Sequence, residues 1–172
     1  AVDGIFVDIG IGKNAFLRRK DLLNEKRFPT EGSPILAQVI KSDTDMKGAL
    51  ITEKISMFGK YAVTLSGTGY IGVSKKIRQE SVRKRLKEIG KEICAEHMGL
   101  IIRTAAENAD MDEFRKDITR LKENWDIIQK RFRMEKSPTL LYRESDIIVK
   151  ALRDYVNKGT EILITDNRTI YE

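Results

Sequence analysis

An arginine and a threonine at the end of a short aliphatic run have the residue types of an anion-binding site. The run Gly99–Ile102 predicts a short buried strand, so Arg103 and Thr104 would lie where that strand gives way to a loop. A guanidinium presents a planar fork of donors that suits phosphate, and the threonine hydroxyl adds one more donor. The alternative is a structural role, because Thr104 and Glu107 have the spacing of a capping box at a helix start.

Two other features of the sequence favour the anion site. Asp110 and Glu113 form a second capping box directly ahead of a long apolar pattern, and this pair makes the better helix start. Thr104 would then not be needed as a cap. Lys75, which follows a predicted strand over residues 70–74, supplies a second cation.

Two phenylalanines near the start of the chain have the pattern of a stacking platform. Residues 5–9 and 14–18 each alternate between apolar and other side chains, and a hairpin centred on Ile11 would place Phe6 opposite Phe16. Both rings would then share a face with polar and charged neighbours rather than with the aliphatic side chains. Aromatic rings on such a face can stack nucleic-acid bases, at about 1–3 kcal/mol for each base. Burial of the two rings in the core is the alternative.

The composition limits the possible classes of protein and partner. The chain has 172 residues, 34% of them charged and 41% hydrophobic, as in an ordinary globular protein. A net charge of +6 and a pI of about 9.4 favour a polyanion such as RNA or DNA. One cysteine and one histidine exclude a disulfide framework and a Cys/His zinc site in this sequence. Without a long apolar run or a signal-peptide pattern, we expect no membrane contact and a cytoplasmic location.

The hydrophobic patterns predict an α+β fold. Short strands with basic tips over residues 1–56 are typical of a small OB-type barrel, here short of one strand at its start. Strands at 61–65 and 70–74 are expected to pair as a hairpin, and two long helices at 81–98 and about 110–135 each have one apolar face. The other expected elements are strands at 5–9, 14–18, 35–41, 49–56, 99–102, 140–142 and 161–165, a helical turn at 21–25 and a helix at 145–157.

The order of these motifs resembles the ribonuclease E/G family. The segments that carry the resemblance are Phe6–Gly10, Lys13–Leu17, Lys47–Thr52, Ile71–Ile77, Leu100–Ala105, Leu152–Tyr155 and Ile162–Ile164. The first three are similar to the S1-type OB domain of that family, and the next two are similar to its 5′-sensor region. The resemblance covers nearly the whole chain.

The resemblance implies a partial OB-type β-barrel followed by an α/β sensor subdomain with two long helices. It divides the chain into an S1-type OB RNA-binding domain at 1–56, without its first strand, and a 5′-sensor region at 57–158. Residues 159–172 would begin an RNase H-like scaffold. Because the sequence opens without methionine and ends without a closing element, we expect it to be a piece of a longer protein.

The resemblance also implies roles for individual residues at the RNA-binding surface. Members of the family are endoribonucleases that cut single-stranded RNA and prefer a 5′-monophosphate end. By motif match, Phe6, Phe16 and Lys47 would hold the RNA on the OB domain.

The remaining matches fall in the sensor pocket. Arg103 and Thr104 fall on its two main phosphate ligands, and Gly59 and Val63 match positions that line the pocket and contact the terminal nucleotide. Lys75 stands where some members have an arginine, so the positive charge is kept but the planar fork is lost.

The family cuts RNA with metal-holding aspartates in a later subdomain and pairs its subunits through a cysteine-rich zinc link. The resemblance therefore implies no catalytic residue, metal ligand or cofactor in these 172 residues. Magnesium and a shared structural zinc are expected in a parent protein that forms a homo-oligomer.

The predicted function is that of the RNA-binding and 5′-monophosphate-sensing segment of a metal-dependent endoribonuclease in RNA processing and decay. One alternative is a stand-alone S1-type RNA-binding module without nuclease activity. Another is a scaffold protein whose apolar helix face at 111–132 pairs with a partner helix.

Overall fold

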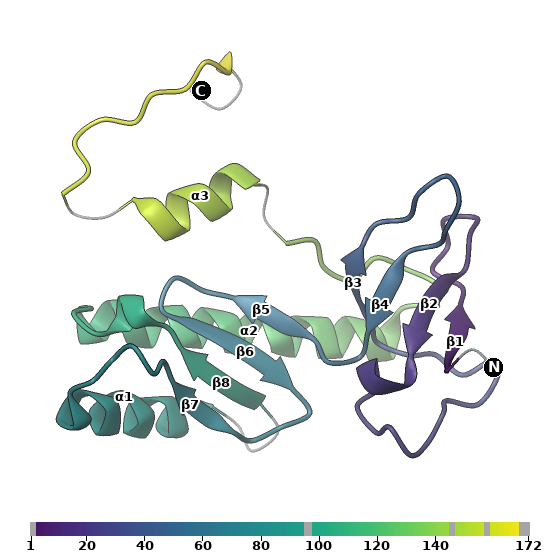
Figure 1. Ribbon diagram of the computed structural model, residues 1–172, viewed down its shortest axis with the longest axis horizontal. Coiled ribbons are helices and arrows are strands. Elements are labelled where there is room, and N and C mark those ends of the chain that lie inside the picture. Colours follow the sequence, from purple (N-terminus) through teal and green to yellow (C-terminus); the bar gives the residue numbers. More distant parts are fainter. Residues whose placement is uncertain (1–2, 95–97, 145–146, 157–158, 169–172) are drawn as a thin grey trace. The chain divides into compact units, whose positions relative to one another are not determined.

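The computed structural model describes residues 3–94, 98–144, 147–156 and 159–168. Contacts divide the chain into two units, Ala1–Tyr142 and Arg143–Glu172. Figure 1 shows the elements of both units in chain order. The first unit contains two four-stranded sheets and two long helices, so the α+β class predicted from the sequence is confirmed.

The first sheet lies in the N-terminal third of the chain. Its strands are β1 (Gly4–Val7), β2 (Ala15–Arg18), β3 (Gln38–Lys41) and β4 (Leu50–Thr52), in the order β1-β2-β4-β3. The β2–β4 pair is parallel and the other two pairs are antiparallel. Its core consists of small and aliphatic side chains, namely Ala15, Leu17, Leu22, Ala49 and Ile51. Among the described residues this sheet is open, with β1 and β3 at its edges, and does not close into a barrel.

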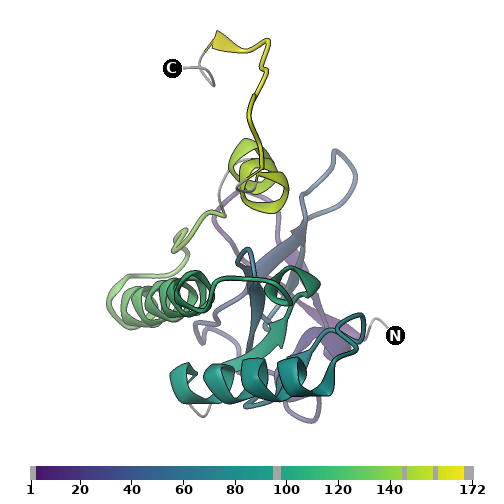
Figure 2. The same ribbon diagram turned by 90° about the vertical axis from the view of Figure 1, so that its left-hand side faces the viewer.

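The second sheet is built from β5 (Ser56–Phe58), β6 (Ala62–Ser66), β7 (Ile71–Val73) and β8 (Met98–Ile102), in the order β5-β6-β8-β7. Helices α1 (Glu80–Ile93) and α2 (Met111–Met134) contribute to one core with its inward-facing side chains. Figure 2 shows α2 nearly end-on and α1 along its length, beside the strands. The core of this half contains Met57, Tyr61, Ala62, Ile71, Ile77, Leu86, Ile89, Leu100, Ile102, Ala106, Phe114, Ile118, Leu121 and Ile128.

The expected hairpin between residues 61–65 and 70–74 is wrong. β8 lies between the two strands, pairs antiparallel with β6 and runs parallel to β7. The chain reaches β8 from β7 through α1, the kind of crossover that parallel neighbours require. Leu100 and Ile102 are both fully buried, so the most aliphatic strand takes a central position in the sheet.

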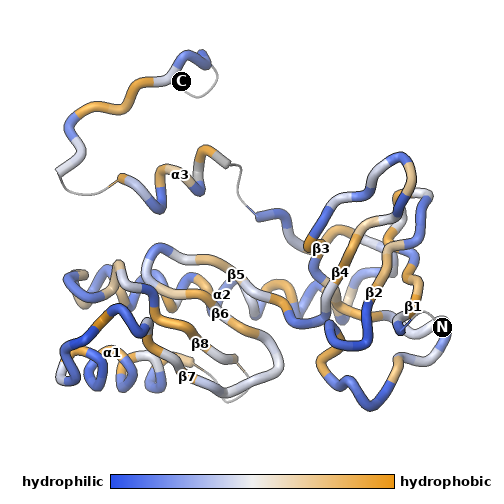
Figure 3. The backbone as a smooth tube through the Cα atoms, in the orientation of Figure 1, coloured by the Kyte–Doolittle hydropathy of each residue, from blue (hydrophilic) through white to orange (hydrophobic). Residues whose placement is uncertain are grey.

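The apolar faces predicted for the two long helices are confirmed. Leu86 and Ile89 of α1 are buried, as are Phe114, Ile118 and Leu121 of α2. Figure 3 shows hydrophobic and hydrophilic positions alternating along both helices. The start of α2 is also as predicted, because the Asp110 carboxylate accepts a hydrogen bond of 2.8 Å from the N–H of Asp112.

Several expected elements differ from the structure. The strand expected at 49–56 is divided into β4 and β5 by residues 53–55, where the chain passes from one sheet to the other. The helical turn expected at 21–25 is replaced by a short 3-10 helix at Arg19–Asp21. No strand forms at 140–142, where the carbonyls of Leu140 and Leu141 accept hydrogen bonds from the Arg131 guanidinium instead of pairing with a strand.

The second unit contains helix α3 (Ile147–Tyr155). Glu144 precedes this helix and forms ion pairs with Lys150 at 3.0 Å and with Arg153 at 3.8 Å. The strand expected at 161–165 is not formed, and the side chains of Ile162 and Ile164 are exposed there instead of packing into a sheet. Within the described parts of both units, no helix is long and apolar enough to cross a membrane.

Candidate nucleic-acid interface

The predicted pairing of two phenylalanines across the β1–β2 hairpin is confirmed. Phe6 lies directly opposite Phe16, and their ring centroids are 5.4 Å apart with the planes tilted by 43°. Phe6 is 67% exposed, whereas Ala15 and Leu17, on either side of Phe16, are fully buried. The alternation of the two strands therefore puts the rings on the solvent side of the sheet.

Gly4 makes room for this ring pair and was not found from the sequence. A Cβ atom at Gly4 would lie 2.6 Å from the ring of Phe16, closer than side-chain atoms can approach. The glycine and the ring are brought together by the β1–β2 register, in which Gly4 faces Arg18. A glycine ahead of an alternating strand is too common a feature to indicate this role in the sequence alone.

Lys47 lies in the loop between β3 and β4 and is exposed. The Lys13 ammonium fixes the tip of this loop by donating to the carbonyls of Thr44 and Asp45 at 3.0 and 2.9 Å. The Phe16 N–H donates to the Ala49 carbonyl at 2.7 Å. Lys47 precedes by two residues the carbonyl that bonds to Phe16, so its cation lies near the start of β4, the strand that pairs with β2.

A second set of predicted residues meets at one edge of the other sheet. Because β7 and β8 are parallel, the segments that follow them leave the sheet at the same edge, and the Ser74 N–H donates to the Ile102 carbonyl at 2.8 Å. Arg103 and Thr104 follow β8, while Lys75 follows β7. The turn between β5 and β6 lies at the same edge, because β6 pairs antiparallel with β8 on the side away from β7.

Arg103 lies against the β5–β6 turn. Its Nη1 donates to the carbonyls of Gly59 at 2.8 Å and Lys60 at 3.3 Å, and its backbone N–H donates to the Tyr61 carbonyl at 2.7 Å. The side chain is half-buried. These contacts give the guanidinium a defined orientation at the sheet edge.

Thr104 is exposed and contacts a serine that was not found from the sequence. Its Oγ1 is 3.0 Å from Oγ of Ser74. The helix-cap alternative for Thr104 is wrong, because Thr104 is the first residue inside a short 3-10 helix, Thr104–Ala106, and Arg103 precedes it in the capping position. In the sequence, the position of Ser74 directly ahead of Lys75 was the only feature that could have indicated its role.

Lys75 is exposed on a loop that an arginine of α1 holds in place. Arg83 donates through Nη1 to the carbonyls of Ser74 at 2.7 Å and Ile77 at 2.9 Å. Lys75 lies between these two anchored residues. The short distance between the Ser74 and Thr104 hydroxyls links this loop to the segment after β8.

Val63 lies on the sheet face that α1 and α2 leave uncovered. In the strand register it faces Phe58 of β5 and Ile101 of β8, both of which are exposed. The structure thus brings Gly59, Arg103 and Thr104 together at one edge, with Lys75 on the adjoining loop and Val63 on the adjoining face. Phe6, Phe16 and Lys47 belong to the other sheet.

A sequence model of the ribonuclease E/G family matches residues 56–172, which include the whole second sheet and its helices. The chain belongs to the ribonuclease E/G family. It is 33% identical to ribonuclease G of Escherichia coli K12, in an alignment that covers 97% of this chain and 38% of the relative.

Two further relatives come from Buchnera aphidicola. A putative ribonuclease E of the subspecies Baizongia pistaciae is 31% identical over 100% of this chain and 46% of the relative. A ribonuclease E of the subspecies Schizaphis graminum is 30% identical over 100% of this chain and 19% of the relative. The chain therefore spans less than half the length of these relatives.

Within the described residues, no group of three or more His, Cys, Asp or Glu side chains is placed to hold an ion.

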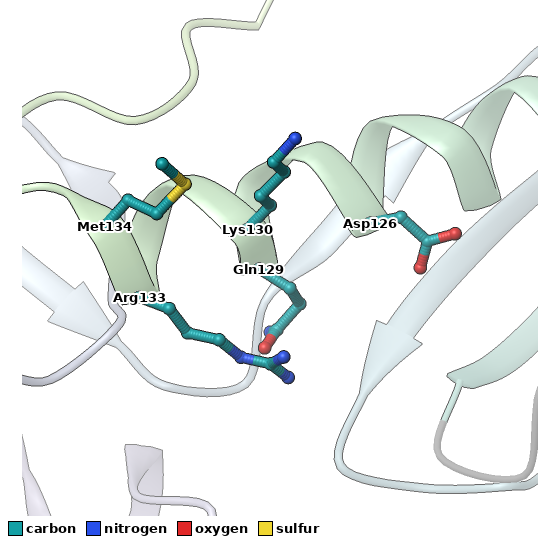
Figure 4. A pocket seen from close by; sticks show the side chains of 5 residues that line it. All are labelled: Asp126, Gln129, Lys130, Arg133 and Met134. Carbon is teal, nitrogen blue, oxygen red and sulfur yellow. The ribbon is translucent and has the colours of Figure 1, made fainter.

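A hollow on the outer side of α2 contains none of the predicted site residues. Figure 4 shows its lining side chains along the C-terminal half of the helix, which are Asp126, Gln129, Lys130, Arg133 and Met134. With two cations and one carboxylate on a single helix, this hollow has no convergent set of polar groups of the kind found in ligand sites.

Proposed function

We propose that this chain is the RNA-binding and 5′-monophosphate-sensing segment of an E/G-type endoribonuclease that acts on single-stranded RNA. The observation that carries the proposal is the meeting of Arg103, Thr104 and Gly59 at one sheet edge, with Lys75 on the adjoining loop. These residues come from three separate segments of the sequence. Membership of the ribonuclease E/G family supports the same conclusion.

The chemistry of this edge favours a terminal phosphate over other RNA groups. A phosphate monoester carries a charge of about −1.5 to −2 at pH 7, more than an internal diester, and it exposes three acceptor oxygens. Arg103 and Lys75 supply positive charge, and the hydroxyl of Thr104 supplies a neutral donor. A 5′-hydroxyl end offers these groups no charge to bind.

The expected gain is in substrate binding. A hydrogen bond between charged partners contributes about 1.5–3 kcal/mol. If the phosphate stays equally bound in the transition state, the gain appears in kcat/KM and not in kcat. Phosphate recognition at this edge would therefore select which RNA molecules are cut without taking part in the cutting.

The first sheet would hold the RNA strand irrespective of its 5′ end. Phe6 and Phe16 present a tilted ring pair on which unpaired bases can stack, and Lys47 provides a cation for a nearby phosphate. Stacking tolerates any base, so this surface would prefer single strands with little sequence specificity. On this proposal residues 1–56 are an S1-type OB domain, 57–158 the sensor region and 159–172 the start of an RNase H-like scaffold.

Cleavage itself would be carried out by another part of the parent protein. The chain matches only 38% of ribonuclease G from E. coli. The family resemblance supports a magnesium-dependent catalytic subdomain, a zinc link between subunits and a cytoplasmic homo-oligomer for the parent.

The test compares two RNA oligonucleotides that differ only in a 5′-phosphate or a 5′-hydroxyl. We expect the chain without substitutions to bind the phosphorylated RNA about 10- to 150-fold more tightly than the 5′-hydroxyl RNA, corresponding to about 1.5–3 kcal/mol. Arg103→Ala should abolish this preference, and Arg103→Lys should keep part of it. The matched control is Arg115→Ala, because Arg115 is an arginine of α2 that pairs with Glu92 at the helix surface. An equal preference in Arg103→Ala and the parent chain would contradict the proposal.

A further inference from the structure

We infer that Asp117 of α2 is a positioning residue for the 5′-phosphate site, acting on Arg103 through two peptide groups of the β5–β6 turn. The consequence for RNA binding rests on the proposed function, whereas the action on Arg103 does not. Neither the sequence patterns nor the family resemblance pointed to Asp117.

The Asp117 carboxylate is buried and holds the turn by its backbone. Its side chain is only 6% exposed. Oδ1 accepts from the Lys60 N–H at 3.2 Å, and Oδ2 accepts from the Tyr61 N–H at 2.9 Å. Arg120 pairs with Oδ1 at 3.1 Å and offsets the charge at the helix surface.

The same two peptide groups contact Arg103 on their other side. The Lys60 N–H and the Gly59 carbonyl belong to one peptide group, and the Tyr61 N–H and the Lys60 carbonyl belong to the next. Both carbonyls accept from Nη1 of Arg103, at 2.8 and 3.3 Å. Each peptide group therefore bridges the carboxylate, through its N–H, to the guanidinium, through its carbonyl.

Such a bridge strengthens the hold on Arg103. A charged acceptor at the N–H end polarises a peptide group and makes its carbonyl a better acceptor, so consecutive hydrogen bonds support one another. Here the negative charge lies at one end of two parallel bridges and the positive charge lies at the other. The arrangement fixes where the guanidinium points before any phosphate arrives.

Gly59 leaves the space that this arrangement needs. A Cβ atom at Gly59 would overlap the Asp117 carboxylate. The resemblance assigns Gly59 to the pocket lining, and the close approach of Asp117 gives a separate physical reason for a glycine there.

A second tie between α2 and the turn makes the role of Asp117 separable from folding. The Tyr61 hydroxyl donates to Oε2 of Glu113 at 2.7 Å, one helical turn before Asp117. Tyr61 and Phe114 also pack with their ring centroids 6.4 Å apart. The turn should therefore remain on α2 when the carboxylate is changed conservatively.

The test is Asp117→Asn in the full chain. Asparagine keeps the size but has one carbonyl oxygen, so one of the two backbone N–H groups would face an amide NH₂ instead of an acceptor. We expect the ratio of affinities for 5′-phosphate and 5′-hydroxyl RNA to fall by about fivefold, since a hydrogen bond contributes roughly 1 kcal/mol. The matched control is Asp126→Asn, because Asp126 is an exposed carboxylate of the same helix (Figure 4). Asp126→Asn should show the same ratio of affinities for 5′-phosphate and 5′-hydroxyl RNA as the chain without substitutions.

A measurement without RNA separates this inference from the proposed function. In nuclear magnetic resonance spectra, a guanidinium held by hydrogen bonds rotates slowly, so Arg103 should give separate Nη signals. Asp117→Asn should allow the guanidinium to rotate faster, and the separate signals should merge. Unchanged Arg103 signals in Asp117→Asn would overturn the inference, even if the RNA preference changed. A parent chain without any preference for 5′-phosphate would overturn the proposed function, while the Arg103 signals would still decide the role of Asp117.

Hydrogen exchange in the parent chain keeps the inference falsifiable if Asp117→Asn does not fold. The Lys60 and Tyr61 amides should exchange slowly, because both donate to a buried carboxylate. Rapid exchange of both amides would overturn the inference. Gly59→Ala should merge the Arg103 signals in the same way as Asp117→Asn, since the added methyl would displace the carboxylate.

Discussion

Phe6 leaves most of a large aromatic ring in solvent, where it gains little from burial. Its contact with Phe16 and its place on a strand restrict the ring, so less conformational freedom is lost when a base stacks on it. Phe16 is more deeply packed against Gly4, which makes Phe6 the cleaner residue for a binding test.

We expect Phe6→Ala to weaken binding of a single-stranded RNA by about 1–3 kcal/mol, the contribution of one stacked base. The loss should be the same for 5′-phosphate and 5′-hydroxyl ends, because the platform and Arg103 lie in different sheets. Fluorescence anisotropy with a labelled oligonucleotide measures both dissociation constants. Phe6→Tyr should bind as the parent does, and an unaltered dissociation constant in Phe6→Ala would remove the stacking role.

At the residue scale, the sequence predicted what depends on neighbours along the chain. The exposed side of Phe6 and Phe16 follows from strand alternation, and the Asp110 cap follows from its spacing to an apolar pattern. Ser74 and Asp117 could not be found in this way. Their roles depend on contacts with Thr104 and with Lys60 and Tyr61, which only the folded chain brings within reach.

At the element scale, the sequence predicted the kinds of element better than their partners. The apolar faces of α1 and α2 follow from helical periodicity, which is a local property. The β6–β7 hairpin was wrong because nearness in sequence favoured it, while burial of the aliphatic β8 decided the actual order. That order is what brings Lys75 and Arg103 to the same edge.

The tie between the β5–β6 turn and α2 should be visible in alkaline unfolding. Burial, together with the hydrogen bond to Glu113, raises the pKa of Tyr61 from 10.0 to about 12. Between these values the unfolded chain loses the Tyr61 proton and the folded chain keeps it. The free energy of unfolding should therefore fall as the pH rises from about 10 to about 12.

Tyr61→Phe removes the titrating group, so its unfolding free energy should fall less steeply over this range. Burial also raises the pKa of the Cys94 thiol to about 11, so a shallower fall should remain in the variant. Urea unfolding at a series of pH values measures the slope, and measurements near pH 8 give the loss of the hydroxyl contact alone. A variant with the slope of the parent would contradict the tie.

At the scale of the whole molecule, the net charge of +6 should make RNA binding depend on salt. The two candidate surfaces differ in how much of their binding is electrostatic. On the proposed function, the Phe6–Phe16 platform would bind RNA by stacking, whereas Lys47, Lys75 and Arg103 would bind it through charge.

We expect the logarithm of RNA affinity to fall linearly with the logarithm of salt concentration, with a slope of about −0.7 for each phosphate contact. Lys47→Ala should make the slope shallower by about that amount, whereas Phe6→Ala should lower the affinity at every salt concentration without changing the slope. A titration from low to high KCl measures both. An unchanged slope in Lys47→Ala would show that this lysine does not contact the RNA backbone.

The peptide bridges between Asp117 and Arg103 have a consequence for how related sequences can diverge. At position 60 the bridges use only main-chain atoms, so the lysine there can be replaced by any residue except proline without loss of either hydrogen bond. Position 59 is closed to any side chain by the carboxylate, and the inferred bridge would require opposite charges at positions 103 and 117. Among related sequences, we therefore expect position 60 to vary beside an invariant glycine at position 59. A substitution at position 117 should be accompanied by a substitution at position 103.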